Sequence, residues 1–141
     1  MAERDTSIIV GDIVNKHYKL IRQIYKGERG VIFCALDTSM NQVAIKFEKI
    51  AEEQPQICVE SAILKLLAGT SCIPQFIHYG SYKNYKYLAM ELIGPNLIDL
   101  VNYKRPYKFS LNSILKFGIQ AIEALQVFHS KGFVHRDIKP V

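Results

Sequence analysis

Cysteine is scarce in this chain, and long apolar runs are absent. Three cysteines in 141 residues, an odd number at wide spacing, match neither a disulfide framework nor a zinc site, because both need ligand pairs close in sequence. Such thiols are typical of a reducing compartment, so we expect a cytoplasmic protein, with the nucleus as the alternative. No apolar run approaches the roughly 18 residues of a membrane span. We therefore expect no membrane partner.

The amino terminus lacks targeting features as well. Residues 1–5, Met-Ala-Glu-Arg-Asp, include two acidic residues and have no apolar core behind them, which argues against a secretory signal. Residue 2 is alanine, not the glycine that myristoylation requires. A hydrophobic content of 49% with 22% charged residues is typical of a folded globular chain. The net charge of +5 is spread along the sequence and gives little support for an anionic partner.

The sequence changes character at Gly94-Pro95, from β-rich to helical. Before this point, apolar and β-branched runs predict five strands and one helix, namely strands at 18–24, 31–36, 42–48, 76–80 and 87–91 and a helix over 57–67. After it, helices are expected over 96–103 and 111–130. The last helix is apolar on nearly every side, which predicts that it is buried. The expected class is α+β, with an extension (1–17), a small lobe (18–93) and the start of a large lobe (94–141).

Three features of the first lobe suggest a phosphate site when they are taken together. Gly27 and Gly30 lie in the turn between two strands, where the lack of a Cβ lets backbone N–H groups approach a phosphate. Strand alternation puts Ala44 and Lys46 on one face, which suits a flat base beside a phosphate chain. Glu60, on the following helix, could hold Lys46 extended. Each feature alone has an ordinary reading, as a hairpin or a solvated side chain.

The most specific pattern is the run of residues 133–140, Phe-Val-His-Arg-Asp-Ile-Lys-Pro. It places a carboxylate, a histidine and two cations in one short loop after an apolar helix. The carboxylate of Asp137 can accept a proton from a hydroxyl group, and Lys139 can neutralise charge on a transferring phosphoryl group.

In this order and spacing, the four features resemble the signature set of the protein kinases. Within the kinases, three phrases resemble the casein-kinase-like group, namely residues 42–48, 90–97 and 129–140. Residues 10–18 and 35–37 further suggest its tau-tubulin kinase branch. The resemblance runs from about Gly11 to Pro140 and implies a two-lobed kinase fold. It also implies transfer of the ATP γ-phosphate to serine or threonine of a protein substrate.

The resemblance implies a role for each matching position. Adenine would be sandwiched by Ile24, Ile32 and Ala44, with Met90 at the back of the pocket. The backbone of Glu91 and Ile93 would hydrogen-bond the edge of the base. Gly27 and Gly30 would cover the phosphates, and Asp99 would reach the ribose. Lys46 would contact the α- and β-phosphates and pair with Glu60. Asp137 would orient and deprotonate the acceptor, and Lys139 indicates serine or threonine rather than tyrosine.

Two departures from the family pattern are visible. Tyr25 stands where kinases have the first loop glycine, with Glu28 and Arg29 at the loop tip, and we expect it to weaken nucleotide binding. The sequence also ends one position before the asparagine of the His-Arg-Asp motif. We therefore expect the Mg²⁺ ligands beyond residue 141 and no metal site within the chain, which by itself would not be catalytically competent. We also expect the helical part to be loosely packed.

Two other functions remain open on the sequence. One is a catalytically inactive module that binds nucleotide or a protein partner, which Tyr25 favours. The other is a nucleic-acid binder, since tyrosines interleave with Lys83 and Lys86 over residues 79–87 and such rings can stack on bases. Tyrosine is also an ordinary strand former, so a plain hairpin is the preferred reading and nucleic acid is not an expected partner.

Overall fold

The computed structural model describes residues 7–51, 55–103 and 105–140. They form two compact units. The first comprises the residues up to Lys65 together with Pro74–Leu92, and the second comprises Leu66–Ile73 and the residues from Ile93 onward. The main part of the second unit thus begins at Ile93, one residue before the predicted change of character at Gly94-Pro95. The short segment Leu66–Ile73, within the range that we expected for the small lobe, groups with the second unit.

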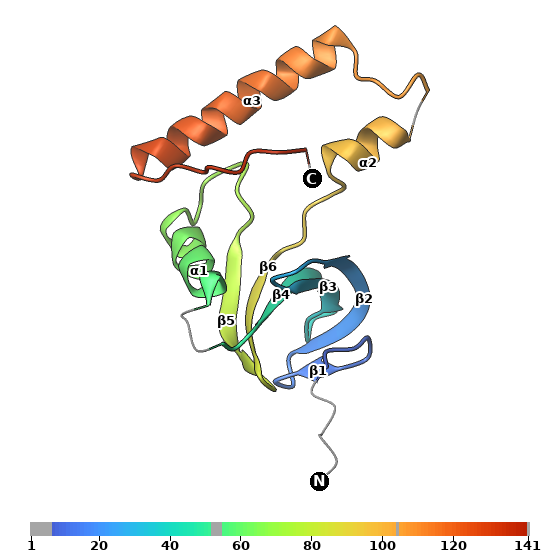
Figure 1. Cartoon of the computed structure of the whole chain (residues 1–141), viewed down its shortest axis with the longest axis vertical. Coiled ribbons are helices and arrows are strands. Elements are labelled where there is room, and N and C mark those ends of the chain that lie inside the picture. Colours follow the sequence, from blue (N-terminus) through green and yellow to red (C-terminus); the bar gives the residue numbers. More distant parts are fainter. Residues whose placement is uncertain (1–6, 52–54, 104, 141) are drawn as a thin grey trace. The chain divides into compact units, whose positions relative to one another are not determined.

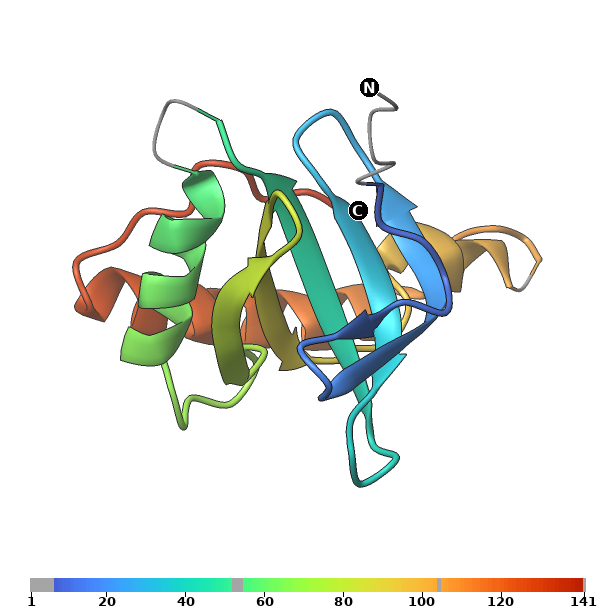
Figure 2. The ribbon, with the colours of Figure 1, turned by 90° about the horizontal axis from the view of Figure 1, so that it is seen from below.

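The first unit is built on a six-stranded sheet in which every pairing is antiparallel and which curls strongly on itself (Figures 1 and 2). The strand order is β1-β2-β3-β4-β6-β5. The strands are β1 (Ile13–Val14), β2 (Tyr18–Lys26), β3 (Val31–Leu36), β4 (Gln42–Lys49), β5 (Phe76–Tyr82) and β6 (Tyr85–Glu91). Five of these were predicted within three residues at either end. The two-residue β1 is too short to carry an alternating pattern and was missed.

Three helices complete the described structure: α1 (Gln56–Leu66), α2 (Leu97–Asn102) and α3 (Leu111–Ser130). All were predicted within one residue at either end. Side-chain oxygens fix the starts of the last two helices, because Asn96 accepts from Asp99 N–H and Ser110 accepts from Ser113 N–H. Such caps satisfy donors that a helix start leaves unpaired.

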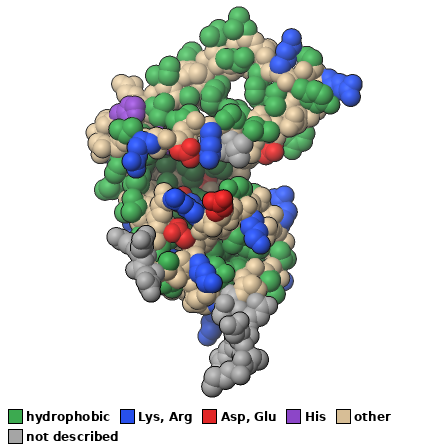
Figure 3. Space-filling view, viewed as in Figure 1, with side chains coloured by type: hydrophobic (Ala, Val, Ile, Leu, Met, Phe, Trp, Pro, Cys, Tyr) green, Lys and Arg blue, Asp and Glu red, His purple; other side chains and the backbone are tan. Residues whose placement is uncertain are grey.

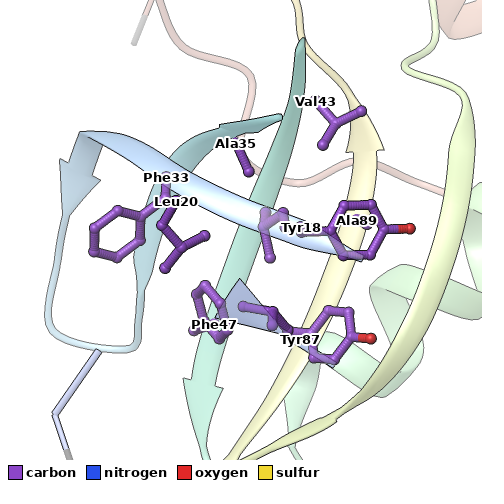
Figure 4. Packing of buried hydrophobic residues seen from close by; sticks show 10 residues of the cluster. Tyr18, Leu20, Phe33, Ala35, Val43, Phe47, Tyr87 and Ala89 are labelled. Atoms are coloured by element: carbon purple, nitrogen blue, oxygen red, sulfur yellow. The ribbon is translucent and has the colours of Figure 1, made fainter. Parts of the chain in front are cut away.

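The hydrophobic core lies on one face of the sheet. Figure 4 shows it filled by side chains from β1, β2, β3, β4 and β6: Val14, Tyr18, Leu20, Phe33, Ala35, Val43, Ile45, Phe47, Tyr87 and Ala89. Phe47 is at its centre. Its ring centroid lies 6.0 Å from that of Phe33, in an edge-on arrangement, and 6.0 Å from that of Tyr87, in a tilted one. Because β4 sends Val43, Ile45 and Phe47 to the core, the side chain of Lys46 projects from the opposite face.

The expectation that α3 is buried is wrong. None of its residues is buried, and Leu111 and Ile122 are 72% and 68% exposed. Figure 3 shows hydrophobic side chains open on its visible face. Burial on every side needs covering elements, and the described second unit contains only one other helix, the six-residue α2.

None of the helices in the described ranges combines the length and the apolarity that a bilayer crossing requires.

Candidate nucleotide-binding and catalytic site

Strand register brings several candidate residues onto one face of the sheet. Ile32 on β3 is paired with Lys46 on β4, and Ala44 on β4 is paired with Met90 on β6. Residues directly opposite each other in antiparallel strands share a face, and alternation puts Ala44 on the face of Lys46. Ile32 and Met90 are half-buried and Ala44 is buried. The result is an apolar strip with a cation at one end.

The predicted contact between Lys46 and Glu60 is present. Lys46 Nζ lies 2.6 Å from Glu60 Oε2, with the two side chains 29% and 36% exposed. Partial exclusion from water strengthens such a pair. The pair holds the lysine extended from β4 and fixes its ammonium group at the edge of the apolar strip.

A second contact ties α1 to the sheet on its other side. Cys58 on α1 shares a 2.6 Å hydrogen bond with the hydroxyl of Tyr79 on β5. Burial, and then this hydrogen bond, raise the pKa of Tyr79 to about 12. The helix that carries Glu60 is therefore held by polar contacts to both β4 and β5.

Gly27 and Gly30 close the turn between β2 and β3, with Gly27 N–H donating to Gly30 C=O at 2.9 Å. The lack of a Cβ has a different structural consequence at each of the two positions. A Cβ at Gly30 would be too close to the backbone carbonyl oxygen of Phe47, so this glycine permits the close pairing of β3 with β4. A Cβ at Gly27 would instead meet the ring and hydroxyl of Tyr25, within 2.5–3.0 Å.

This difference predicts unequal effects for two matched substitutions. Gly30→Ala is expected to lower the free energy of unfolding by about 1–3 kcal/mol, because a backbone neighbour must shift. Gly27→Ala is expected to cost less than about 1 kcal/mol, because the Tyr25 ring can swing away and alanine restricts the unfolded chain. Urea unfolding of both variants measures the difference. Equal losses would contradict the assigned roles.

Tyr25 lies on the same face as the lysine. It is paired with Ile32 across β2 and β3, and Ile32 is in turn paired with Lys46. Tyr25 is 52% exposed, and its ring folds back over Gly27. The phenol therefore stands beside the backbone that we expect to approach phosphates.

Replacing Tyr25 by glycine is accordingly expected to raise the affinity for ATP. We expect a gain of about threefold to tenfold, as for the relief of a modest steric conflict. Isothermal titration of the 141-residue chain with ATP measures it. Tyr25→Phe keeps the ring and is expected to bind like the unsubstituted chain. An unchanged affinity in the glycine variant would show that the ring is no obstacle.

The connector residues occupy the end of β6 and the start of the second unit. Glu91 N–H donates to Gln75 C=O at 2.9 Å, and the Glu91 carboxylate accepts from Gln75 N–H at 3.0 Å. A base edge would therefore have to use the carbonyl of Glu91 rather than its N–H. Of the other residues expected around adenine, Ile93 after β6 is 64% exposed and Ile24 on β2 is 47% exposed.

Asp99 has a structural partner in the second unit. Its carboxylate accepts from Asn96 N–H at 3.3 Å while its own N–H donates to Asn96 Oδ1 at 2.8 Å. This reciprocal pair is a capping box at the start of α2. A contact between Asp99 and a ribose stays a prediction.

The loop after α3 holds the two remaining candidates. Lys139 Nζ lies 3.3 Å from Asp137 Oδ2, with both side chains well exposed. His135 Nδ1 accepts from Asp137 N–H at 3.2 Å, and its ring packs on Phe128 at 5.8 Å. Arg136 has a positive φ of 66°, a conformation that costs energy for a non-glycine residue and recurs at functional sites.

The end of this loop is tied to the start of α2, because Leu97 N–H donates to Pro140 C=O at 3.1 Å. The loop is thus fixed at both ends, by Phe128 on α3 and by Leu97 on α2. The carboxylate of Asp137 is held outward beside an ammonium group. This arrangement can accept a proton from a hydroxyl and stabilise negative charge nearby.

The comparisons with known proteins identify this arrangement. The sequence model of the protein kinase domain family matches residues 18–141 of this chain. The chain belongs to the protein kinase family. It is 37% identical over 131 residues to a probable serine/threonine-protein kinase of Dictyostelium discoideum, and the match covers 92% of this chain and 26% of that protein. The chain therefore spans about a quarter of the length of this relative.

The fold is that of a kinase domain as well. A crystal structure of a kinase domain matches with a TM-score of 0.84 at 21% identity, over 95% of this chain and 41% of that chain. At this identity the match concerns the fold alone. The α+β kinase-like class expected from the sequence is thus confirmed.

Mg²⁺ is the metal that the resemblance to kinases implies. Across the described ranges, no group of three or more His, Cys, Asp or Glu side chains could hold a metal ion. The carboxylate of Asp137 is paired with Lys139 instead. The described residues therefore do not by themselves fit a resident Mg²⁺ site.

Proposed function

We propose that this chain provides the ATP-binding face and the catalytic loop of a protein serine/threonine kinase. One observation carries the proposal: the Lys46–Glu60 pair stands at the end of an apolar strip on the sheet face opposite the core. An adenine ring suits the strip, and the ammonium suits the phosphates that follow it. The family match supports the same reaction.

Each residue has a stated task in the transfer. Lys46 holds the α- and β-phosphates and is itself held by Glu60. Asp137 orients the acceptor hydroxyl and takes its proton as the γ-phosphoryl group leaves ADP. Lys139, 3.3 Å from Asp137, neutralises charge on the group in transfer. Bound Mg²⁺ would neutralise the β- and γ-phosphates, with ligands outside residues 1–141.

The finer assignments rest on the sequence resemblance. We propose the casein-kinase-like group, and within it the tau-tubulin branch, with a protein substrate in the cytoplasm. The free thiols of Cys34, Cys58 and Cys72 support a reducing location. Lys139 supports serine or threonine as the acceptor.

A chimera tests the proposal without requiring activity from these residues alone. Residues 1–141 replace the matching part of the Dictyostelium kinase, and transfer from γ-labelled ATP to a casein substrate is measured. Label on serine or threonine after acid hydrolysis supports the proposal. Label on tyrosine alone would overturn the acceptor assignment.

The inactive module is the second candidate, favoured by the Tyr25 ring over Gly27. The same chimera separates the two functions. ATP binding without transfer, in a folded chimera whose unmodified parent is active, would decide for the inactive module.

A further inference from the structure

The start of α1 lacks the residues that usually cap a helix. The residue before it is Pro55, which has no side-chain oxygen, and its first turn holds no acidic residue. Four N–H groups at a helix start have no partner within the helix, and the positive end of the helix dipole lies there. The cap must therefore come from elsewhere in the chain.

Glu48 on β4 supplies it. Its two carboxylate oxygens accept from Gln56 N–H at 2.9 Å and from Ile57 N–H at 3.1 Å. Ile57 is completely buried, so its N–H has no access to water and depends on this contact. A carboxylate is also the group that the dipole at this end of the helix favours.

The same strand contacts the same helix at a second point, through Lys46 and Glu60. Lys46 and Glu48 are two residues apart on one face of β4, about 6.7 Å along the strand. The helix residues that they contact, Gln56 and Glu60, are four apart, about 6 Å along the axis. Two polar contacts at matching spacing fix both the height and the rotation of α1 against β4.

The glycine-bearing loop reaches the same turn of the helix. Arg29, at the tip of the loop, donates from Nη1 to the side-chain oxygen of Gln56. The side chain of Gln56 therefore contacts the loop through Arg29, and its backbone N–H contacts the carboxylate of Glu48. The loop tip, β4 and the helix that carries Glu60 meet in one junction.

We propose that Glu48 is a positioning residue, whose carboxylate holds α1 at the height at which Glu60 meets Lys46, and that Arg29 and Gln56 link the phosphate-binding loop to this position. The inference rests on the proposed function, because its effect on the reaction is exerted through the lysine that binds ATP. Neither Glu48 nor Gln56 needs to touch the nucleotide.

A double-mutant cycle on the 141-residue chain tests the first part. Glu48→Gln keeps the shape but loses the charge and one acceptor, and is expected to lower the affinity for ATP by about threefold to tenfold. The affinity for adenosine, which has no phosphates, stays the same. In the Glu60→Gln background, Glu48→Gln is expected to have no further effect, because the ion pair between Lys46 and Glu60 is already lost there.

The matched control is Glu123→Gln, which removes an exposed carboxylate from α3 and is expected to leave both affinities unchanged. A purely structural Glu48 would give the same ATP loss in both backgrounds, or a lower melting temperature with no ATP loss. Either result overturns the proposal.

The loop link has its own cycle. Arg29→Ala and Gln56→Ala each weaken ATP binding, and the double variant is no weaker than the worse single variant, because either change breaks the same hydrogen bond. Multiplicative losses would overturn this part, since they would mean that the two side chains act separately.

Amide hydrogen exchange separates failure of this inference from failure of the proposed function. If the unsubstituted chain binds neither ATP nor adenosine, the proposed function fails. The exchange rates of the α1 amides then still test whether Glu48 positions this helix. Faster exchange through Glu60 in Glu48→Gln supports the positioning role. Faster exchange confined to the first-turn amides overturns it.

Discussion

Replacing Asp137 by asparagine in the chimera is expected to lower the rate of phosphoryl transfer by about 10²- to 10⁴-fold, the usual contribution of a positioned general base. Asparagine keeps the size of the side chain but does not accept a proton at neutral pH. The pairing with Lys139 at 3.3 Å is weakened as well, so the cation is less well placed. Initial rates at saturating ATP and acceptor measure the loss.

The affinity for ATP separates this effect from misfolding. We expect the Asp137→Asn chimera to bind ATP as the unsubstituted chimera does, since its carboxylate acts on the acceptor. Glu123→Gln, a charge change of the same size on α3, is expected to retain full activity. An Asp137→Asn chimera that retains more than a tenth of the rate would remove this residue from the mechanism.

The second large effect is expected at Lys46. Lys46→Met is expected to lower the affinity for ATP by about 10- to 100-fold, since a charge-assisted hydrogen bond contributes roughly 1.5–3 kcal/mol. Methionine keeps the length and the apolar stem but has no charge. Adenosine is expected to bind both chains equally, because it lacks phosphates. Isothermal titration with the two ligands gives the comparison.

Lys49→Met is the matched control, three residues along the same strand. Lys49 is exposed and paired with Tyr85 on β6, and alternation sends it to the face opposite Lys46. We expect its removal to leave the affinity for ATP within twofold. Equal losses at both lysines would indicate a general effect of charge rather than a phosphate contact at Lys46.

Local patterns were sufficient to predict most of the strands. The pairing of Lys46 with Glu60, 14 positions apart, was implied instead by the resemblance to kinases. Alternation over residues 43–47 fixed which side chains face the core, and this choice necessarily puts Lys46 on the other face. The start and end of α3 followed from its apolar run, and both are confirmed. These features depend on neighbours in sequence, which is why the sequence was informative.

Apart from the Lys46–Glu60 pair, features that depend on contacts between distant segments were not predicted. The cap of α1 by Glu48 joins residues eight and nine positions apart, and a strand residue carries no signal that it caps a helix. Pro55 before an otherwise uncapped helix was the one hint. The exposure of α3 was missed for a related reason, because an apolar helix indicates what it can bury and not what is present to cover it.

The most direct measurement uses an acyl phosphate of ATP, which transfers its acyl group to amines next to the γ-phosphate. The 141-residue chain is treated with this reagent, digested and analysed by mass spectrometry. A nucleotide whose phosphates are held by Lys46 predicts acylation of Lys46 above the other lysines of the sheet, suppressed by excess ATP. Uniform labelling that ATP does not suppress would contradict a nucleotide site at Lys46.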